Sequence, residues 1–373
     1  MFHYKEHGKM VFVYLDNNIY QSLLIYYLCV GLKNKLTMII QDNYSLQQHN
    51  TFNLDIKTRW FVQYDSEEEL KRLLSDEYFF SQSFWHIGQG SNLLFLDDFN
   101  GVIVHSGIKG IEKIKEDDDS VWLKVGAAEV FDSFVSYCVD NGWGGIENLS
   151  LIPGEVGASA FQNIGAYGVE AADCIEEVHT FCLKSGEKKI FLKEECNYSY
   201  RNSFFKEDAN RGLYYITYVV YRLHKTPNYK LDYGNVRQRL EGKEINLKNI
   251  RQAVIDIRKE KLPDHKVWGN AGSFFTNPYV SNEKLKELQA LYTDMPFYTY
   301  NKDSVKIPAA WLIEQCGLKG LEYGGAAIYE KQPLVIINKN NATGNDIALL
   351  AEEVRTAVIN KFGIELMPEV NYI

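Results

Sequence analysis

Apolar and polar positions predict alternating strands and helices from Asn50 onward. The apolar and aromatic run at 61–64 predicts a strand, and the run at 85–88 predicts another. Between them, Ser66 precedes Glu69 by three positions, which is the capping-box pattern of a short helix. The second strand continues into a Gly-Gln-Gly-Ser turn and the apolar run 93–96. This order places a glycine turn at the end of a strand, where ligands are often held.

Three longer segments predict helices. Residues 129–141 form the first, which Gly142 closes as the residue after the helix. Residues 246–261 carry Ile250, Val254 and Ile257 on one face, and Pro263 stops that helix. Residues 345–362 form the third, closed by Gly363. The sequence holds no internal repeat and no low-complexity tract.

The first 37 residues differ from the rest. The apolar stretch 19–32 is too short to span a bilayer, and no small-residue cleavage pattern follows it. Met38 then opens a segment typical of an N-terminus. We therefore expect residues 1–37 to be an extension from an early start codon; a helical or membrane-associated appendage is the alternative. A second boundary near 226–228 predicts one domain over 38–226 and another over 227–373.

Length and composition narrow the class of protein. A chain of 373 residues with 46% hydrophobic residues suggests two or three packed domains. The net charge of −9 argues against a protein that coats nucleic acid. Six scattered cysteines without a CxxC pair indicate reduced thiols in the cytoplasm. No metal-ligand spacing occurs, and we expect a monomer without stable membrane insertion.

Two glycine-rich regions, 88–95 and 144–168, require a reason in the backbone. No P-loop signature is present, and the first region has only two of the three glycines of a dinucleotide fingerprint. The glycines therefore fit a dinucleotide only if its pyrophosphate lies against loop amides of another fold. Irregular turns without a ligand are the alternative.

A third segment, 269–278, reads Gly-Asn-Ala-Gly-Ser-Phe-Phe-Thr-Asn-Pro. Glycine allows close approach of a ligand, and Ser273 supplies a small hydroxyl beside apolar bulk. The residues after Ser273 do not complete the Gly-x-Ser-x-Gly pattern of a hydrolase nucleophile. From the residues alone, Ser273 is a proton donor, a nucleophile or a structural turn hydroxyl.

Taken together, these motifs resemble the UDP-N-acetylenolpyruvoylglucosamine reductase family. The two glycine-rich regions look like its flavin loops. Four further motifs follow in its order: Asn-Thr-Phe at 50–52, Tyr-Arg-Asn-Ser at 200–203, Lys-Leu-Pro at 261–263 and Pro-Glu-Val at 368–370. With the Ser273 segment, the resemblance covers about 38–373. The region around Tyr233 resembles the longer, type I form.

The resemblance implies a fold and a reaction. The fold would be α+β, with a vanillyl-alcohol-oxidase-type FAD-binding fold of two lobes and a C-terminal α+β substrate-binding domain. FAD, bound non-covalently, and NADPH as co-substrate would reduce UDP-N-acetylglucosamine-enolpyruvate to UDP-N-acetylmuramate, a peptidoglycan precursor. NADPH and the sugar nucleotide would use one pocket in turn, giving ping-pong kinetics, because no separate nicotinamide-binding fingerprint is evident.

The resemblance also implies three catalytic residues. Ser273 would donate a proton to the substrate carbanion, and Arg201 would stabilise the enolate, since a guanidinium holds a carboxylate bidentately. Glu369 would donate a hydrogen bond to the enolate if a neighbouring carboxylate raised its pKa. Without the resemblance, Arg201 would be a surface ion pair and Glu369 an exposed tail residue.

Binding residues are carried over position by position. Those implied for the flavin are Gly88, Gly90, Ser91, Asn92, Asn163, Ile164 and Gly165. Those implied for the substrate are Tyr167, Tyr233, Lys261, Asn277, Tyr298, Lys319 and Gln332. One departure is visible: Ala158 stands where the family commonly has a hydroxyl side chain, so that flavin contact is absent.

Two other functions stay open at this point. One is a flavoprotein of the same fold that oxidises a sugar or an alcohol with oxygen. The other is a nucleotide-sugar-binding module without turnover. Ser273, Arg201 and Glu369 together weigh against both, because an alkene reduction needs them and an alcohol oxidation has no evident use for them.

Overall fold

The structure is a computed structural model that describes residues 2–6, 9–13, 38–76, 79 and 81–373. Near the N-terminus, β1 (Phe2–Glu6) and β2 (Lys9–Val13) pair as an antiparallel hairpin. The apolar stretch 19–32, on which the interpretation of 1–37 depends, lies outside the described residues.

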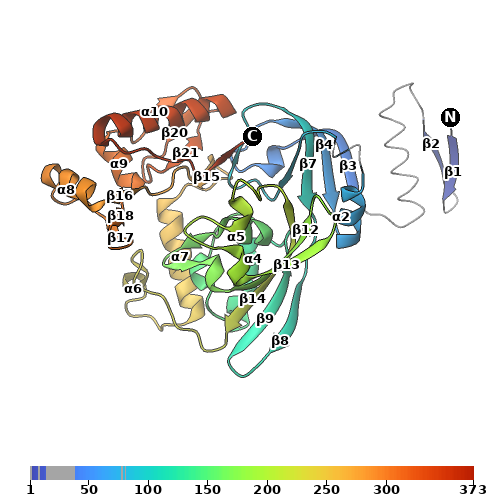
Figure 1. The fold of residues 1–373 in the computed structure, drawn as a ribbon, viewed down its shortest axis with the longest axis horizontal. Coiled ribbons are helices and arrows are strands. Elements are labelled where there is room, and N and C mark those ends of the chain that lie inside the picture. Colours follow the sequence, from blue (N-terminus) through green and yellow to red (C-terminus); the bar gives the residue numbers. More distant parts are fainter. Residues whose placement is uncertain (1, 7–8, 14–37, 77–78, 80) are drawn as a thin grey trace.

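The first lobe is built on a four-stranded sheet in the order β3-β4-β7-β5 (Figure 1). The strands β4, β7 and β5 run parallel, and β3 is antiparallel to β4. Successive residues of β4 point to opposite faces, so Val62 and Phe61 enter separate apolar clusters. The elements of this lobe are β3 (Ile39–Ser45), η1 (Gln47–His49), β4 (Lys57–Tyr64), α2 (Glu67–Leu74), β5 (Phe84–Ile87), β6 (Leu93–Leu94) and β7 (Phe99–Ser106).

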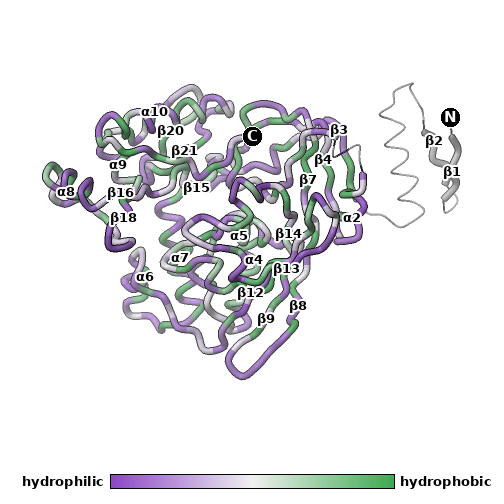
Figure 2. The backbone as a smooth tube through the Cα atoms, in the orientation of Figure 1, coloured by the Kyte–Doolittle hydropathy of each residue, from purple (hydrophilic) through white to green (hydrophobic). Residues whose placement is uncertain are grey.

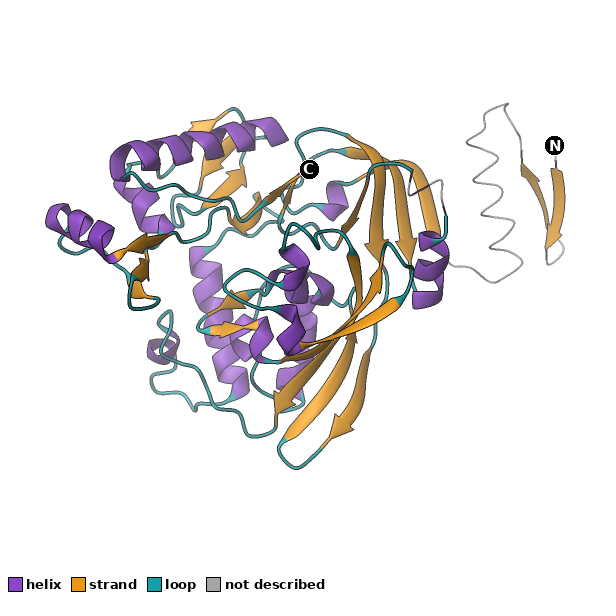
Figure 3. Ribbon diagram, in the orientation of Figure 1, coloured by secondary structure: helices purple, strands orange, loops and turns teal. Residues whose placement is uncertain are grey.

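The second lobe is an antiparallel sheet in the order β13-β12-β14-β9-β8, with α4 and α5 packed beside it (Figure 3). The turn between β8 and β9 projects from the sheet and is hydrophilic (Figure 2), as its Asp117-Asp118-Asp119 sequence requires. The elements are β8 (Ile111–Glu116), β9 (Ser120–Gly126), α4 (Phe131–Asp140), η2 (Glu147–Leu149), α5 (Val156–Gln162), β10 (Gly165–Ala166), β11 (Val169–Glu170), η3 (Ala171–Asp173), β12 (Ile175–Cys182), β13 (Lys188–Leu192), η4 (Lys193–Cys196), η5 (Phe204–Lys206) and β14 (Tyr214–His224).

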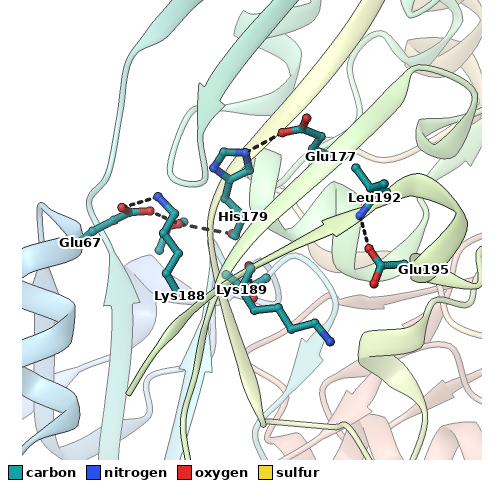
Figure 4. A network of polar contacts seen from close by, with 9 residues as sticks. Glu67, Glu177, His179, Lys188, Lys189, Leu192 and Glu195 are labelled. Carbon is teal, nitrogen blue, oxygen red and sulfur yellow. Dashed lines mark hydrogen bonds and ion pairs between the residues drawn. The ribbon is translucent and has the colours of Figure 1, made fainter. Parts of the chain in front are cut away.

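Apolar and polar contacts join the two lobes. Phe181 and Tyr215 of the second sheet lie in the apolar cluster of the first lobe. Glu67, at the start of α2, accepts hydrogen bonds from Lys188 Nζ and Thr217 Oγ1, both at 2.7 Å (Figure 4). Because both partners belong to the second sheet, Glu67 ties α2 to it. These contacts therefore hold the two lobes against each other.

The C-terminal part has its own apolar core. A four-stranded sheet, β15-β21-β20-β19, packs beside α9 and α10, and a small sheet, β16-β18-β17, lies next to α8. Its elements are β15 (Gly269–Ser273), β16 (Tyr279–Ser281), α8 (Asn282–Leu291), β17 (Tyr298–Thr299), β18 (Ser304–Lys306), α9 (Ala309–Gln315), β19 (Glu322–Tyr323), β20 (Ala326–Ile328), β21 (Val335–Asn338), α10 (Gly344–Phe362) and β22 (Asn371–Tyr372).

Two helices connect the lobes to this part, α6 (Val236–Arg239) and α7 (Leu247–Lys261). Although α7 follows the expected boundary near 226–228, it packs against α4 and η2 of the second lobe. Arg251 of α7 pairs with Asp132 of α4 at 2.6 Å. The boundary itself stays a prediction.

The helix predictions are confirmed at their ends. Ser66 accepts from Glu69 N and caps α2, Asn246 caps α7, and Gly363 follows α10 at φ +64°. The helix expected over 129–141 starts two residues later, at Phe131, because Val130 is extended and bridges to Glu155. Among the described residues, no helix is long and apolar enough to cross a bilayer.

Candidate active site

A cavity of about 600 Å³ opens where the strand ends of the two lobes meet. Its wall includes the first glycine loop, the start of α5 and the segment before β14. Its lining residues include Trp85, His86, Gly88, Gly90, Ser91, Asn92, Glu155, Ala158, Gln162, Arg211, Tyr215 and Asn371. The first loop thus lies in the position that the strand–turn–strand pattern predicted.

Gly90 has no room for a side chain. Its φ is +67°, and a Cβ at this position would lie 1.9 Å from the carbonyl oxygen of His49. Gly90 O also accepts a hydrogen bond from Thr51 N at 3.3 Å. The main chain of the loop is therefore packed directly on the segment before it, and only glycine fits.

The cavity fits a flavin dinucleotide. It is within the size range of small-molecule sites, and its wall includes several aromatic side chains and glycines. Tyr215 Oη is buried without a hydrogen-bond partner among the described atoms. The His86 ring stacks on the Tyr215 ring at 4.2 Å, and burial lowers the pKa of His86 to about 3, so it is uncharged. The cavity thus combines an apolar stacking surface with an unused polar atom.

A buried acid also lines this cavity. Glu155 Oε1 lies 3.1 Å from His105 Nε2, and both side chains are largely buried. The other oxygen of Glu155 approaches Gly88, where an added Cβ would lie 2.9 Å from it. The sequence offered no signal for this pair, because Glu155 and His105 come from separate segments.

Ala158 lines the cavity, so the wall has no hydroxyl at this position. The neighbouring Ser159 does not replace it. Its hydroxyl is buried and bonds to Tyr221 Oη and to Val156 O, both at 2.7 Å. Side-chain contact from this turn is therefore lost, while its backbone groups stay available.

The second glycine region is held in place by the side chain of Asn163. The Asn163 amide is fully buried; it donates to Glu170 Oε2 and Ser199 O and accepts from Ala172 N. Its side chain is thus committed to holding the loop, so any flavin contact of Asn163 would involve the backbone. Ile164 and Gly165 follow it, and Gly165 O accepts a hydrogen bond from Arg201 Nη2 at 2.7 Å.

The end of the chain brings Glu369 to the same place. Asn371 and Tyr372 of β22 pair in parallel with β6, which follows the first glycine loop. Asn92 donates through Nδ2 to the carbonyl oxygen of Glu369 at 2.9 Å, and Glu369 N donates to Phe274 O at 2.8 Å. Glu369 is therefore held between the first glycine loop and the residue after Ser273.

Arg201 and Glu369 form a largely buried ion pair. Arg201 Nε lies 3.1 Å from Glu369 Oε1, and the two side chains are 23% and 15% exposed. The distance is that of an ion pair, but the N–H does not point at the oxygen as in a hydrogen bond. Burial raises the pKa of Glu369, and the charges of Arg201 and Lys206 act in the opposite direction. The predicted rise is confirmed, but its cause is burial and not a second carboxylate.

A smaller cavity of about 370 Å³ lies against Glu369. Lys206 and Arg211 line it with Thr276, and Trp85 and Asn371 are shared with the larger cavity. Two cations thus accompany one buried acid beside the flavin-sized cavity. In the part of the chain that the structure describes, no cluster of three potential metal ligands occurs.

Ser273 ends β15 and is exposed. A bulge separates it from Asn270 in the pairing with β21, and Gly272 before it has φ +71°. Within the described residues, its hydroxyl has no hydrogen-bond partner, so it is free to donate to a bound molecule. Its role as proton donor stays a prediction.

Aromatic side chains gather on the exposed side of Arg201. The rings of Tyr233 and Tyr298 stack at 6.3 Å, and each is nearly half exposed. Lys306 Nζ lies 4.2 Å from the centroid of the Tyr200 ring, a cation–π contact. Asn277 contacts the Tyr200 side chain and accepts a hydrogen bond from Ala309 N at 2.9 Å. Two residues implied for substrate, Tyr233 and Tyr298, are thus brought together.

Tyr167 lies under the loop that carries Tyr233. Its φ is +50°, and its carbonyl oxygen accepts from Asn148 Nδ2 at 2.8 Å. Gly234 packs on its ring, where a Cβ would lie 2.7 Å from a ring carbon. The small residue at 234 lets the Tyr233 loop approach the second flavin region.

Of the other implied substrate residues, one lies at the end of the connecting helix α7 and two lie in the C-terminal part. Lys261 ends α7 and is exposed, Lys319 pairs with Glu314, and Gln332 lies in the turn before β21. No contact among the described residues ties these three side chains to Arg201 or Glu369, so their roles stay predictions.

Two cationic residues near the site, Lys206 and Lys306, were not predicted from the sequence. Lys206 follows Arg201 by five residues, and this spacing was a usable signal because both lie in one short segment. Lys306 gave no such signal, since pairing of β18 with β16 and β17 carries it toward Tyr200.

Comparison with known proteins agrees with this geometry. Residues 263–373 match the family model described as UDP-N-acetylenolpyruvoylglucosamine reductase, C-terminal domain. Residues 58–188 match the model described as FAD binding domain. The first match covers the C-terminal part, and the second covers the lobes from β4 to the start of β13.

Similar whole proteins carry the same name. UDP-N-acetylenolpyruvoylglucosamine reductases of Bacteroides fragilis and Porphyromonas gingivalis are 50% and 48% identical, over 90% of this chain and 100% of theirs. The Thermus caldophilus enzyme of that name has a similar solved structure, with a TM-score of 0.63 at 22% identity over 90% of this chain and 99% of that one. p-Cresol methylhydroxylase shares the fold at a TM-score of 0.50 and 12% identity, over 92% of this chain and 87% of that one. The chain belongs to the UDP-N-acetylenolpyruvoylglucosamine reductase family, a family of FAD-binding oxidoreductases.

Proposed function

We propose that the chain reduces the enolpyruvyl group of UDP-N-acetylglucosamine-enolpyruvate to a lactyl ether, giving UDP-N-acetylmuramate, with NADPH as reductant. One observation carries this proposal: the Arg201–Glu369 pair is fixed between the first flavin loop and the Ser273 strand. Bound FAD would supply a redox centre that receives a hydride from NADPH and delivers it to the terminal methylene carbon. The domain over 38–226 would hold FAD, and that over 227–373 would supply substrate contacts.

The protein's part in this chemistry is charge stabilisation and proton delivery. Hydride addition at the methylene carbon leaves negative charge on the adjacent carbon and its carboxylate. Arg201 keeps its positive charge throughout and is directed into the site by its bond to Gly165 O. A protonated Glu369, favoured by burial, would donate a hydrogen bond to the enolate. Both groups therefore act where the negative charge develops.

Ser273 would complete the reaction by donating its hydroxyl proton to the carbon next to the carboxylate. A serine hydroxyl is a weak acid that is fully protonated at neutral pH, and a carbanion-like centre is basic enough to take its proton. Ser273 is exposed, and its hydroxyl makes no hydrogen bond to any residue that the structure describes, which supports this role. Solvent would later restore the serine proton.

The aromatic group around Arg201 would hold the sugar nucleotide. Tyr233 and Tyr298 would close over the diphosphate, with Lys306 as a further positive charge beside them. We expect NADPH to use the same space, which gives ping-pong kinetics. Parallel double-reciprocal plots would agree, whereas a complex with both molecules bound together would contradict it.

The protein's setting is a further part of the proposal. The described cysteines, Cys138, Cys174, Cys182, Cys196 and Cys316, are all unpaired. Free thiols are typical of a reducing compartment, so we place the reaction in the cytoplasm.

The decisive experiment follows NADPH oxidation by the FAD-loaded protein under nitrogen, with and without the enolpyruvyl substrate. We expect oxidation beyond one equivalent only when the substrate is present, and formation of UDP-N-acetylmuramate in equal amount. NADPH oxidation at the same rate with and without the substrate would contradict this function. Turnover that needs oxygen together with a sugar or an alcohol would favour an oxidase instead.

A further inference from the structure

Arg201 sits in a turn whose backbone is strained. Ser199 and Asn202 exchange two main-chain hydrogen bonds, of 3.1 and 2.9 Å, across a two-residue turn. Arg201 is the second residue of this turn and has φ +56°. The left-handed conformation is unfavourable for a non-glycine residue, so the surrounding contacts must hold it.

Three side-chain hydrogen bonds hold the turn and the segment after it. Asn163 Nδ2 donates to Ser199 O at 2.9 Å, and Ser203 Oγ donates to Phe161 O at 2.5 Å. The third is different, because Lys206 Nζ donates to the carbonyl oxygen of Arg201 itself at 2.7 Å. Lys206 thus contacts the strained residue directly.

The fold fixes where Lys206 lies. It ends the short helix η5, and the residue before it, Phe205, is fully buried in the core of the second lobe. The rings of Phe191 and Phe204 pack on Phe205 at 5.1 and 5.7 Å. An aromatic anchor therefore directs the amine back over the turn.

Lys206 is also an unusual cation. Its side chain is half-buried against the smaller cavity, and no carboxylate among the described residues lies within ion-pair distance of it. Burial lowers its pKa, while the charge of Glu369 acts in the opposite direction. A half-buried ammonium without a direct ion pair is unfavourable for stability. This cost indicates that the contact of Lys206 with Arg201 serves the function of the site.

We propose that Lys206 is a positioning residue for reduction of the enolpyruvyl group: its ammonium fixes the Arg201 turn and thereby sets the guanidinium against Glu369. This rests on the function proposed above. The amine does not need to touch substrate. It acts through the main chain of Arg201 and through its charge, which faces the same buried acid.

Loss of this contact should slow one half of the reaction only. A shift of about 1 Å in a catalytic group can cost up to about 100-fold in rate. In Lys206→Met we expect substrate-driven reoxidation of the reduced protein to slow by about 10- to 100-fold at saturating substrate. Reduction by NADPH should change by less than about threefold, because it does not require stabilisation of an enolate. Lys206→Arg, which keeps the charge, should recover most of the rate.

The matched control is Lys361→Met. Lys361 also donates to a main-chain carbonyl, that of Gln315, but in the last turn of α10. It should leave both half-reactions unchanged. If Lys206→Met does not fold, Lys206→Gln replaces it, since the amide keeps an N–H donor and removes the charge.

The pH profile gives a readout that a purely structural role would not move. Charged and titratable groups around Glu369 are Arg201, Lys206, Arg211, Tyr200 and Tyr372. Removing the Lys206 charge stabilises protonated Glu369, so the pH dependence of the second half-reaction should move to higher pH in Lys206→Gln and stay in place in Lys206→Arg.

Three results would overturn the proposal. They are an unchanged second half-reaction in Lys206→Met, a higher KM at unchanged kcat, which would make Lys206 a binding contact, or equal slowing of both half-reactions. The wild-type protein separates this test from the previous one: if it does not turn over the enolpyruvyl substrate, the proposed function fails first.

Discussion

The flavin-sized cavity and the Arg201–Glu369 cluster are built in different ways. The cavity is shaped by the main chain: Gly90 packs on His49 O without space for a Cβ, and Tyr215 and His86 add an aromatic wall. The cluster instead depends on a few directed polar contacts between segments far apart in the chain. We therefore expect the cavity to tolerate the absence of a hydroxyl at Ala158, and we expect the loss of any one contact in the cluster to change the reaction.

The first way to test this contrast removes a single hydroxyl from the catalytic region. Ser273→Ala should slow substrate reduction by about 10²- to 10⁴-fold, the usual contribution of a general acid. Reduction by NADPH should persist, because the cavity is untouched. Stopped-flow absorbance of the two half-reactions measures both. If substrate reduction stays within a few-fold of wild type, Ser273 is not the acid.

The second test damages the cavity and spares the cluster. Gly90→Ala puts a Cβ 1.9 Å from His49 O, so the loop must shift, and FAD retention should fall by about tenfold or more, since each 1.4 kcal/mol is tenfold in affinity. Gly142→Ala is the control: it has similar strain, at φ +77°, but open space. Flavin-to-protein absorbance after dialysis gives the result. Equal losses in both variants would mean that strain, and not close packing, explains Gly90.

The third test asks whether Glu369 has the properties of a buried acid. Its folded-state pKa lies above the ordinary 4.5, so the folded protein binds this proton more tightly than the unfolded chain. The unfolding free energy therefore decreases as pH rises from 4.5 through the folded pKa. Glu369→Gln has no such group, so its unfolding free energy should decrease less over the same range in urea titrations. An identical pH dependence in the two proteins would show that the charges of Arg201 and Lys206 fully offset the effect of burial.

The smallest effect is expected from restoring the missing hydroxyl. Ala158→Ser adds a hydrogen-bonding group to the cavity wall, and a net contribution of about 1 kcal/mol would slow FAD loss about fivefold. Ser159→Ala serves for comparison, because that hydroxyl bonds to Tyr221 and not to the cavity. Faster FAD loss in Ala158→Ser would mean that the wall has no space for the oxygen.

The local predictions succeeded where one segment carries all the information. Helix ends followed from Ser66, Pro263 and Gly363, because a cap or a stop depends on neighbouring residues. The first glycine loop followed from its position between two strands. The physical reason for glycine in this loop was only partly predicted. The sequence predicted close approach of a ligand, and the structure shows that His49 O also lies too close to Gly90 for a side chain.

Predictions that needed distant contacts were incomplete. The pKa of Glu369 is raised as expected, but by burial between β6 and the Ser273 strand, which no local pattern describes. Asn163 has its side chain engaged by the protein, and Lys306 reaches Tyr200 only through strand pairing. Such contacts depend on which strands meet, and one sequence does not specify that.

The sequence by itself determined the family, the glycine loops and the residue types needed for the chemistry, because these lie in short motifs whose order along the chain is visible. The tertiary structure decided how they act together. Parallel pairing of β22 with β6 buries Glu369 beside Arg201, and Lys206 fixes the strained turn that presents the guanidinium. The physical reason is that burial and electrostatic fields depend on distance in space, which the linear order of residues does not contain.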